Sequence, residues 1–184
     1  MPWANGGGST RQVAIDPPDG SLQRGFRWRV SCAQVASDGP FSRLPGVDRS
    51  LWLVRGSGMR LRFADREVVL AEPMQRVDFA GEDDVRAELL GGPCEDCNVM
   101  TRREVVRADA RIEHLAEQET RQLSTCAQRL VFVLAGRVSI ASPSGVDALE
   151  LLAGDAAVVE SKNAAWLSSL QRSLALSIAF DLLP

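Results

Sequence analysis

The chain has 184 residues, of which 45% are hydrophobic and 24% charged, so it can bury a core as one large domain or two small ones. Its formal net charge is −3, and its 21 Lys and Arg are well mixed with its 24 Asp and Glu, which leaves no basic stripe for nucleic acid. No apolar run approaches the roughly 18 residues of a membrane span, and the N-terminus has no signal-peptide pattern. We therefore expect a cytoplasmic protein with no nucleic-acid or membrane partner and with four reduced cysteines.

A glycine run, Gly6-Gly7-Gly8, lies between Asn5 and the pair Ser9-Thr10. The run is not a phosphate-binding P-loop, because no Lys-Ser/Thr pair follows it at the required spacing. It also lacks the helix of a dinucleotide fingerprint, since the turn sequence "IDPPDG" comes next. Two interpretations stay open: a flexible loop, or a nest of backbone N–H donors that fits a carboxylate or phosphate.

The next segments have the pattern of strands. Every second residue from Phe26 to Cys32 is apolar, which predicts a half-buried strand. A long Gly- and Pro-containing connection follows, and residues 51–63 predict a strand pair around a glycine turn. Residues 173–180 alternate large and small side chains, as in a strand packed on both sides. Only residues 103–118 also fit a helix face, so we predict an all-β chain of sandwich or barrel type with little helix.

Two blocks of the first half recur in the second half. Residues 129–140 repeat the pattern of the first strand pair with Gly136 over Gly56, an offset of 80. Residues 149–159 repeat the pattern of residues 67–77 with an offset of 82. Because two blocks recur in the same order with little drift, the sequence indicates an internal duplication.

The segment "VLAG", followed by "LLAGDAAVV", resembles the second half of a cupin barrel. The duplication then implies a bicupin, with two cupin-type β-barrels in one chain. The blocks "MPWANGGGSTR", "WRVSCAQVASDGPFSRLPGVDRSL", "LLGGP" and "DCNVMTRR" are similar to successive signatures of the HutD/Ves family. This resemblance implies one bicupin unit over residues 1–184, with a ligand-binding barrel in residues 1–103 and a degenerate barrel in residues 104–184. It also implies a link to histidine utilisation and a regulatory role with a small ligand.

The chain departs from the family pattern at three points. Ala4 stands where the family usually has Lys, which removes one cation beside the glycine run. Cys97 stands where the family usually has Phe. Family members commonly carry a further strand before the Met-Pro-Trp block, so the sequence leaves open whether the native chain begins upstream of Met1 and how that barrel edge is paired.

The sequence has few of the residues that cupin enzymes use for metal binding or acid–base catalysis. Catalytic cupins usually hold a metal with two or three His, and this chain has only His114. If residues 106–114 form a strand, His114 shares its face with apolar residues, which predicts a packed core histidine. The chain has no Tyr, so the His–Tyr pair of cupin sugar epimerases is also missing. We expect no metal and no cofactor.

The pair Cys94 and Cys97 has the CxxC spacing of zinc and redox sites. A structural zinc needs four ligands, and Cys32, Cys126 and His114 do not supply a second pair at that spacing. A redox pair would need a βαβ unit, which the pattern does not predict. We interpret the cysteines as incidental thiols.

The remaining candidates point to recognition of a small anion. Neutral polar groups and exposed N–H donors come from the glycine run, cations from three arginines, and apolar walls from Trp3, Phe41 and Met100. Each also has a purely structural interpretation: Trp3 as a barrel cap, Phe41 as a loop plug, and Arg49 as a surface partner of an aspartate. The candidate ligand-binding residues are Trp3, Asn5, Gly6, Gly7, Gly8, Thr10, Arg29, Phe41, Ser42, Asp48, Arg49, Asn98, Met100 and Arg102.

The sequence therefore favours a metal-free protein that binds a small carboxylate metabolite of histidine breakdown, such as urocanate or a formyl- or formimino-glutamate, without chemical change. One alternative is an enzyme, an isomerase or hydrolase, with Asp48, Asp96 or His114 as a base. Another is an interaction scaffold whose second barrel forms a homodimer surface.

Overall fold

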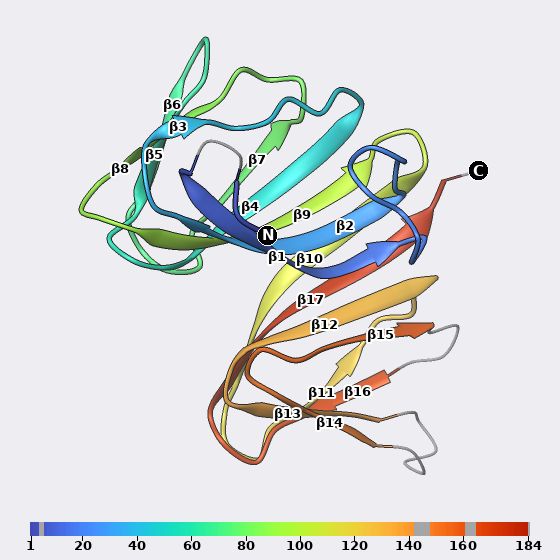
Figure 1. Ribbon diagram of the computed structural model, residues 1–184. Helices are drawn as coiled ribbons and strands as arrows, with labels where there is room; N and C mark the ends of the chain where they lie inside the picture. The colour runs from blue at the N-terminus through green and yellow to red at the C-terminus, as the bar shows by residue number, and fades with distance from the viewer. Residues whose placement is uncertain (4–5, 142–147, 161–164, 184) are drawn as a thin grey trace. The chain divides into compact units, whose positions relative to one another are not determined.

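The computed structural model describes residues 1–3, 6–141, 148–160 and 165–183 (Figure 1). All regular structure in these residues is β-strand, which confirms the all-β prediction. The segment that also fitted a helix contains the strand β10 (Val106–Leu115). In the described residues we find no helix of the length and apolarity that a membrane crossing needs. The chain divides into two compact units, Met1–Val105 and Val106–Pro184.

The first unit consists of two antiparallel sheets. One has five strands in the order β1-β2-β9-β4-β7, and the other has four in the order β3-β8-β5-β6. Apolar side chains on the facing sides of the two sheets form the core between them, as in a β-sandwich. The strands are β1 (Gly8–Asp16), β2 (Trp28–Val35), β3 (Gly39–Pro40), β4 (Val47–Arg55), β5 (Met59–Arg62), β6 (Glu67–Leu70), β7 (Arg76–Ala80), β8 (Arg86–Leu89) and β9 (Cys94–Arg102).

The core of the first unit fills one end of this sandwich. Leu51 and Leu53 from β4 pack with Met59 and Leu61 from β5, and all four are fully buried. Burial of such a side chain stabilises the fold by about 1.5–3 kcal/mol. The same face of β4 carries Arg49 two residues before Leu51, so this inward face changes from apolar to charged along the strand.

The second unit has the same architecture with one strand fewer among the described residues (Figure 1). Its sheets have the orders β10-β17-β12-β15 and β11-β16-β13-β14. Its core contains Val131 and Val133 from β12 and Val138 and Ile140 from β13. Besides β10, the strands are β11 (Thr120–Leu123), β12 (Gln128–Ala135), β13 (Arg137–Ala141), β14 (Leu149–Leu152), β15 (Ala156–Glu160), β16 (Ala165–Ser168) and β17 (Ser173–Leu182).

The strand orders of the two units correspond one to one, which agrees with the predicted duplication. Strands β2, β9, β4 and β7 match β10, β17, β12 and β15, and the second sheets match in the same way. β1 is the additional strand of the first unit. Even the irregularity of the ladder recurs, because a bulge follows Leu53 in β4 and Val133 in β12.

The predicted match of Gly56 with Gly136 has a backbone reason. Both residues follow the bulge and have positive φ, +100° and +80°. A Cβ on Gly56 would lie 2.7 Å from the Cα of Cys94, and a Cβ on Gly136 would lie 2.4 Å from the Oγ of Ser173. Each unit therefore needs a glycine where this turn passes close to a neighbouring strand.

The offset of 82 for the second block is correct for β6 and β14 but wrong beyond them. Leu51 pairs with Val77, and Val131 pairs with Ala157, so β7 and β15 return to an offset of 80. The turn between β6 and β7 is two residues longer than the turn between β14 and β15, which accounts for the change of offset. Met74 occupies the positive-φ position that Gly154 has in the second unit.

The predicted solvent-exposed face of β2 is wrong. Arg29 and Ser31 are as buried as Trp28 and Val30, so both faces of this strand are covered. The polar face points into the first unit, where it borders a cavity. β17 is packed on both sides, as predicted.

Candidate functional site

A cavity of about 600 Å³ occupies the end of the first sandwich that the apolar core leaves open. Its floor is formed by the inward faces of three neighbouring strands, β2, β9 and β4. Their register places Arg29, Met100 and Arg49 in one row across the sheet. The next row contains Ser31 and Asn98, and the row nearest the core contains Asp96.

Arg49 is one of two buried cations of this cavity, with 4% of its surface exposed. Its Nε donates to Oδ1 of Asn98 at 3.3 Å, and its Nη1 donates to the carbonyl of Ser42 at 3.3 Å. The guanidinium carbon lies 5.1 Å from the ring centre of Phe41 and 4.8 Å from that of Phe79. Burial lowers its pKa to about 10, so the side chain still carries its charge at neutral pH.

Arg29 lies beside Arg49 and is equally buried. Its Nε donates to Oε1 of Gln12 at 3.1 Å, and its Nη1 donates to Oγ of Ser31 at 3.0 Å. Burial lowers its pKa as well. In the described part of the chain, neither arginine takes part in an ion pair. Two positive charges thus share one partly closed space with neutral hydrogen-bond partners.

Asp96 is the buried acid of the cavity, with 1% of its surface exposed. Burial raises its pKa to about 7, an effect that the charge of Arg49 partly offsets. Its Oδ2 has no hydrogen-bond partner among the described residues. At neutral pH this carboxyl group is therefore divided between its protonated and ionised forms and cancels only part of the arginine charge.

The N-terminal segment contributes to the lining of the cavity. Trp3 lines it and donates from Nε1 to Oγ1 of Thr10 at 2.7 Å. The amide of Gly6 donates to the carbonyl of Trp3, and the amide of Trp3 donates to the carbonyl of Gly8. A Cβ on Gly8 would meet the carbonyl oxygen of Gln34 at 2.2 Å. The run makes a tight turn against β2, and the Gly6 amide is not a spare donor for an anion.

The structure brings most of the predicted ligand-binding residues to this one cavity. Asp48 and Arg102 are not among its lining residues: Asp48 pairs with Arg103 at 2.7 Å, and Arg102 donates to the carbonyl of Pro45. Asn5 lies outside the described residues. Of the glycines, Gly7 borders the cavity and Gly6 and Gly8 do not. The predicted residues that line it are Trp3, Gly7, Thr10, Arg29, Phe41, Ser42, Arg49, Asn98 and Met100.

Comparison with known proteins shows the family to which this chain belongs. The sequence matches the HutD family over residues 1–176. The chain belongs to the HutD family. It is similar to the structure of HutD from Pseudomonas fluorescens SBW25 in a formate condition, with 28% identity, a TM-score of 0.79, and coverage of 100% of this chain and 94% of that one.

Two further solved structures extend the comparison. A conserved protein of unknown function from Pseudomonas aeruginosa PAO1 has 27% identity and a TM-score of 0.87, over 100% of this chain and 94% of that one. A cupin 2 conserved barrel domain protein from Leptotrichia buccalis has 9% identity and a TM-score of 0.58, over 96% and 89% of the two chains. The similarity to the Leptotrichia buccalis protein shows the fold alone, and it confirms that the chain forms two cupin-type sandwiches. The HutD family relates this chain to histidine utilisation.

Sequence reasoning missed several lining residues of this HutD-family cavity. Ser31 and Ala33 alternate with buried apolar residues on β2. Asp96, which precedes Asn98 by two residues on β9, was considered only as the base of an enzyme and not as a ligand-binding residue. The signal was available as a shared strand face, because residues two apart point to the same side. A half-buried strand was expected instead, so the smaller residues on the polar face of β2 were not considered as lining.

The core position predicted for His114 is wrong, because its side chain is exposed. The inward face of β10 carries Asp109, Arg111 and Glu113, and His114 lies on the other face. The expectation failed because it took the more apolar face of the strand as the inward one. In the described part of the chain, no three His, Cys, Asp or Glu residues are placed to hold a metal ion.

The metal site of cupin enzymes has no counterpart in the donor set of the first cavity. Its floor presents two guanidinium groups and one buried carboxyl where such a site needs several imidazoles. Cys94 and Cys97 lie three positions apart on β9, so they face opposite sides of the strand. Burial, followed by the charge of Asp96, raises the pKa of Cys94 to about 11. Cys94 and Cys97 therefore do not form a pair with each other, and the floor of the first cavity does not fit the metal centre of cupin enzymes.

Proposed function

We propose that this HutD-family protein binds a small carboxylate metabolite of histidine breakdown in the first cavity and acts in a regulatory role without transforming it. The observation that carries the proposal is the pair of buried arginines, Arg29 and Arg49, with no carboxylate in ion-pair contact among the described side chains. A buried charge without a partner is costly. A carboxylate ligand compensates it and gains charge-assisted hydrogen bonds.

The walls of the cavity favour a ligand with a flat or apolar part. Trp3, Phe41 and Met100 line it, and the Arg49 guanidinium lies against the Phe41 ring. Urocanate combines a carboxylate with a planar conjugated ring system of suitable size for a cavity of about 600 Å³. A formyl- or formimino-glutamate offers carboxylates with a polar end, for which Ser31 and Asn98 are hydrogen-bond partners. The family relationship to histidine utilisation supports this choice of candidates.

The arginines and the neutral polar groups of the cavity are suited to binding a ligand. Its arginines fix an anion by position, and its neutral groups orient the rest of the molecule. Occupancy then shifts the population of conformers by the difference in affinity for each, which is sufficient for sensing or sequestration.

The test is a thermal-shift screen of the chain with urocanate, N-formyl-L-glutamate and N-formimino-L-glutamate, followed by analysis of the recovered ligand. We expect at least one of them to raise the unfolding temperature and to be recovered unchanged. The absence of any shift at millimolar concentrations would contradict the proposal.

One observation favours an enzyme as the second candidate. Asp96 lies in the same cavity, its pKa is raised to about 7, and one carboxyl oxygen has no partner. A carboxyl with these properties is suited to act as a general base in an isomerase or hydrolase. Conversion of a bound ligand that is lost in Asp96→Asn, while binding is retained, would replace the binding role with this one.

A further inference from the structure

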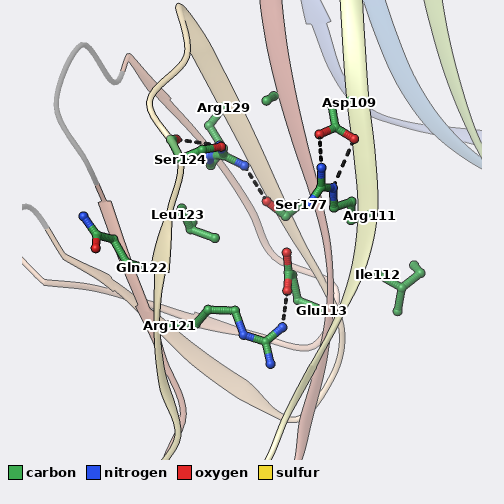
Figure 2. Close-up of a pocket in the computed structure, with 11 residues that line it drawn as sticks. Asp109, Arg111, Ile112, Glu113, Arg121, Gln122, Leu123, Ser124, Arg129 and Ser177 are labelled. Carbon is green, nitrogen blue, oxygen red and sulfur yellow. Dashed lines mark hydrogen bonds and ion pairs between the residues drawn. The ribbon is translucent and has the colours of Figure 1, made fainter.

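The second unit contains a cavity of its own, of about 420 Å³, whose lining residues Figure 2 shows. It lies on the strands that correspond to those of the first cavity. It is lined by the inward faces of β10, β12 and β17 together with β11. Arg129 on β12 has the strand position of Arg49 on β4, because each precedes its bulge by the same number of residues. The duplication therefore places a buried arginine in both cavities.

Arg129 has 4% of its surface exposed and is held by neutral groups. Its Nη1 donates to Oγ of Ser177 at 2.9 Å, and its Nη2 donates to the carbonyl and Oγ of Ser124 (Figure 2). Its Nε has no hydrogen-bond partner among the described residues. A buried donor without an acceptor is rare in folded proteins, and it points to a missing partner.

The charge of Arg129 is also uncompensated within the described residues. The other two arginines of the cavity are paired. Arg111 contacts Asp109 at 2.7 Å, and Arg121 contacts Glu113 at 2.5 Å (Figure 2). Arg121 also contacts Glu119 at 2.5 Å. Arg129 forms no ion pair in the described part of the chain. The nearby thiol of Cys126 does not supply the charge, because burial raises its pKa. Of the three arginines that line this cavity, Arg129 is therefore the one that no carboxylate of the described residues contacts.

We infer that the second unit holds a separate binding site for a small polar monocarboxylate, whose carboxylate is bound by Arg129. A single carboxylate compensates the one lining arginine without an ion pair, and its oxygen supplies the acceptor that Nε lacks. Nε is shielded from solvent in this conformation, so the guanidinium turns slightly when the ligand binds. The hydroxyl group of Ser124 in the wall suits a hydroxyl group of the ligand. The aromatic walls of the first cavity are missing from this lining, which excludes flat apolar ligands such as those favoured there.

The test uses the full chain, labelled with ¹⁵N, and L-lactate and glycerate as probes, with lactamide as the uncharged counterpart of lactate. We expect the two acids to shift the amide resonances of Glu113, Gln122, Ser124 and Ser177, and lactamide at the same concentration to leave them in place. Resonances of Arg29 and Asn98 report on the first cavity, so failure of either site is seen independently of the other.

Two variants with a matched control assign the effect to Arg129. Arg129→Gln should weaken binding of lactate at least tenfold, whereas Arg107→Gln, which removes an exposed arginine of β10, should leave it unchanged. Arg129→Lys keeps the charge and loses the forked geometry, so it should weaken binding by a smaller factor and serves as the decisive variant if Arg129→Gln does not fold.

Several results would overturn the inference. These are shifts confined to residues of the first unit, equal shifts with lactate and lactamide, or a lactate affinity that survives both Arg129 variants. Arg49→Gln should leave the second-unit shifts intact, and their loss in that variant would also contradict a separate site.

Discussion

The two units share a frame and differ in the charges placed on it. In both, the row of the floor nearest the core carries one buried acid, but Asp96 lies on β9 whereas Glu113 lies on β10, the counterpart of β2. Both units also have an arginine at the same strand position, Arg49 on β4 and Arg129 on β12. The outermost row has opposite charges, because Arg29 corresponds to Asp109.

This difference shows how a duplicated fold separates its ligands. The first cavity gathers positive charge under aromatic walls, whereas the second pairs most of its charges internally and leaves one guanidinium over. The backbone and its bulge are retained because the glycines after them have no alternative, while the inward side chains vary. The frame thus fixes where an anion is bound, and the neighbouring rows decide which anion.

The largest expected effect separates the two arginines. Arg49→Gln should weaken binding of a ligand in the first cavity about 100-fold, because a charged hydrogen-bonding partner contributes about 2–3 kcal/mol. Arg129→Gln should leave that affinity within a factor of two. Isothermal titration calorimetry with the strongest ligand of the thermal-shift screen measures both, and Arg55→Gln, an exposed arginine of β4, is the control. Equal losses in both variants would contradict two independent cavities.

The shared frame itself is tested at Gly56. Gly56→Ala should lower the free energy of unfolding by about 3 kcal/mol, because the new Cβ meets the backbone of β9 and φ is positive. Gly92→Ala is the matched control, since its φ is also positive but nothing lies within 4 Å of the added Cβ; a loss of about 1 kcal/mol is expected. Urea denaturation measures both, and equal losses would show that the close approach is unimportant.

The buried acid of the first cavity makes its affinity depend on pH. Protonation of Asp96 removes a negative charge close to Arg49, so affinity for a carboxylate should rise as pH falls from 8 to 6, by about threefold to tenfold. Titrations in buffers across this range measure the change. Asp96→Asn should make the affinity nearly constant, and a variant that keeps the full pH dependence would exclude Asp96 as its cause.

The same carboxyl affects stability with a defined sign. Its pKa is raised from 3.8 to about 7 in the folded chain, so the folded state holds its proton more tightly than the unfolded one. The stabilisation from this proton is complete below pH 4 and is lost as pH rises to about 7. Asp96→Asn should therefore flatten the decline of the unfolding free energy between pH 4 and pH 7.

The smallest expected effect concerns a predicted residue that the structure does not bring into the cavity. Asp48 pairs with Arg103 on the outer face of β4, so Asp48→Asn should change ligand affinity by less than a factor of two. The same calorimetric titration checks it. A tenfold loss would return Asp48 to the site.

The sequence was sufficient for the strand pattern, the duplication and both arginines of the first cavity. Alternation and glycine turns predict strands locally, and Gly56 and Gly136 mark the same turn in each half. The inward direction of a strand was harder, because β2 and β10 turn their more polar faces inward and that depends on which cavity a sheet encloses. Arg129 was missed because the polar residues around it come from separate strands, β10, β11, β12 and β17, and no local pattern groups them.

The most direct measurement compares urocanate with its uncharged amide in calorimetric titrations of the unmodified chain. The account predicts that the acid binds, that the amide binds at least tenfold more weakly, and that the acid is recovered unchanged. Equal affinity for the two compounds, or binding of neither them nor any other carboxylate of the pathway, would contradict the claim that the buried arginines of the first cavity recognise an anion.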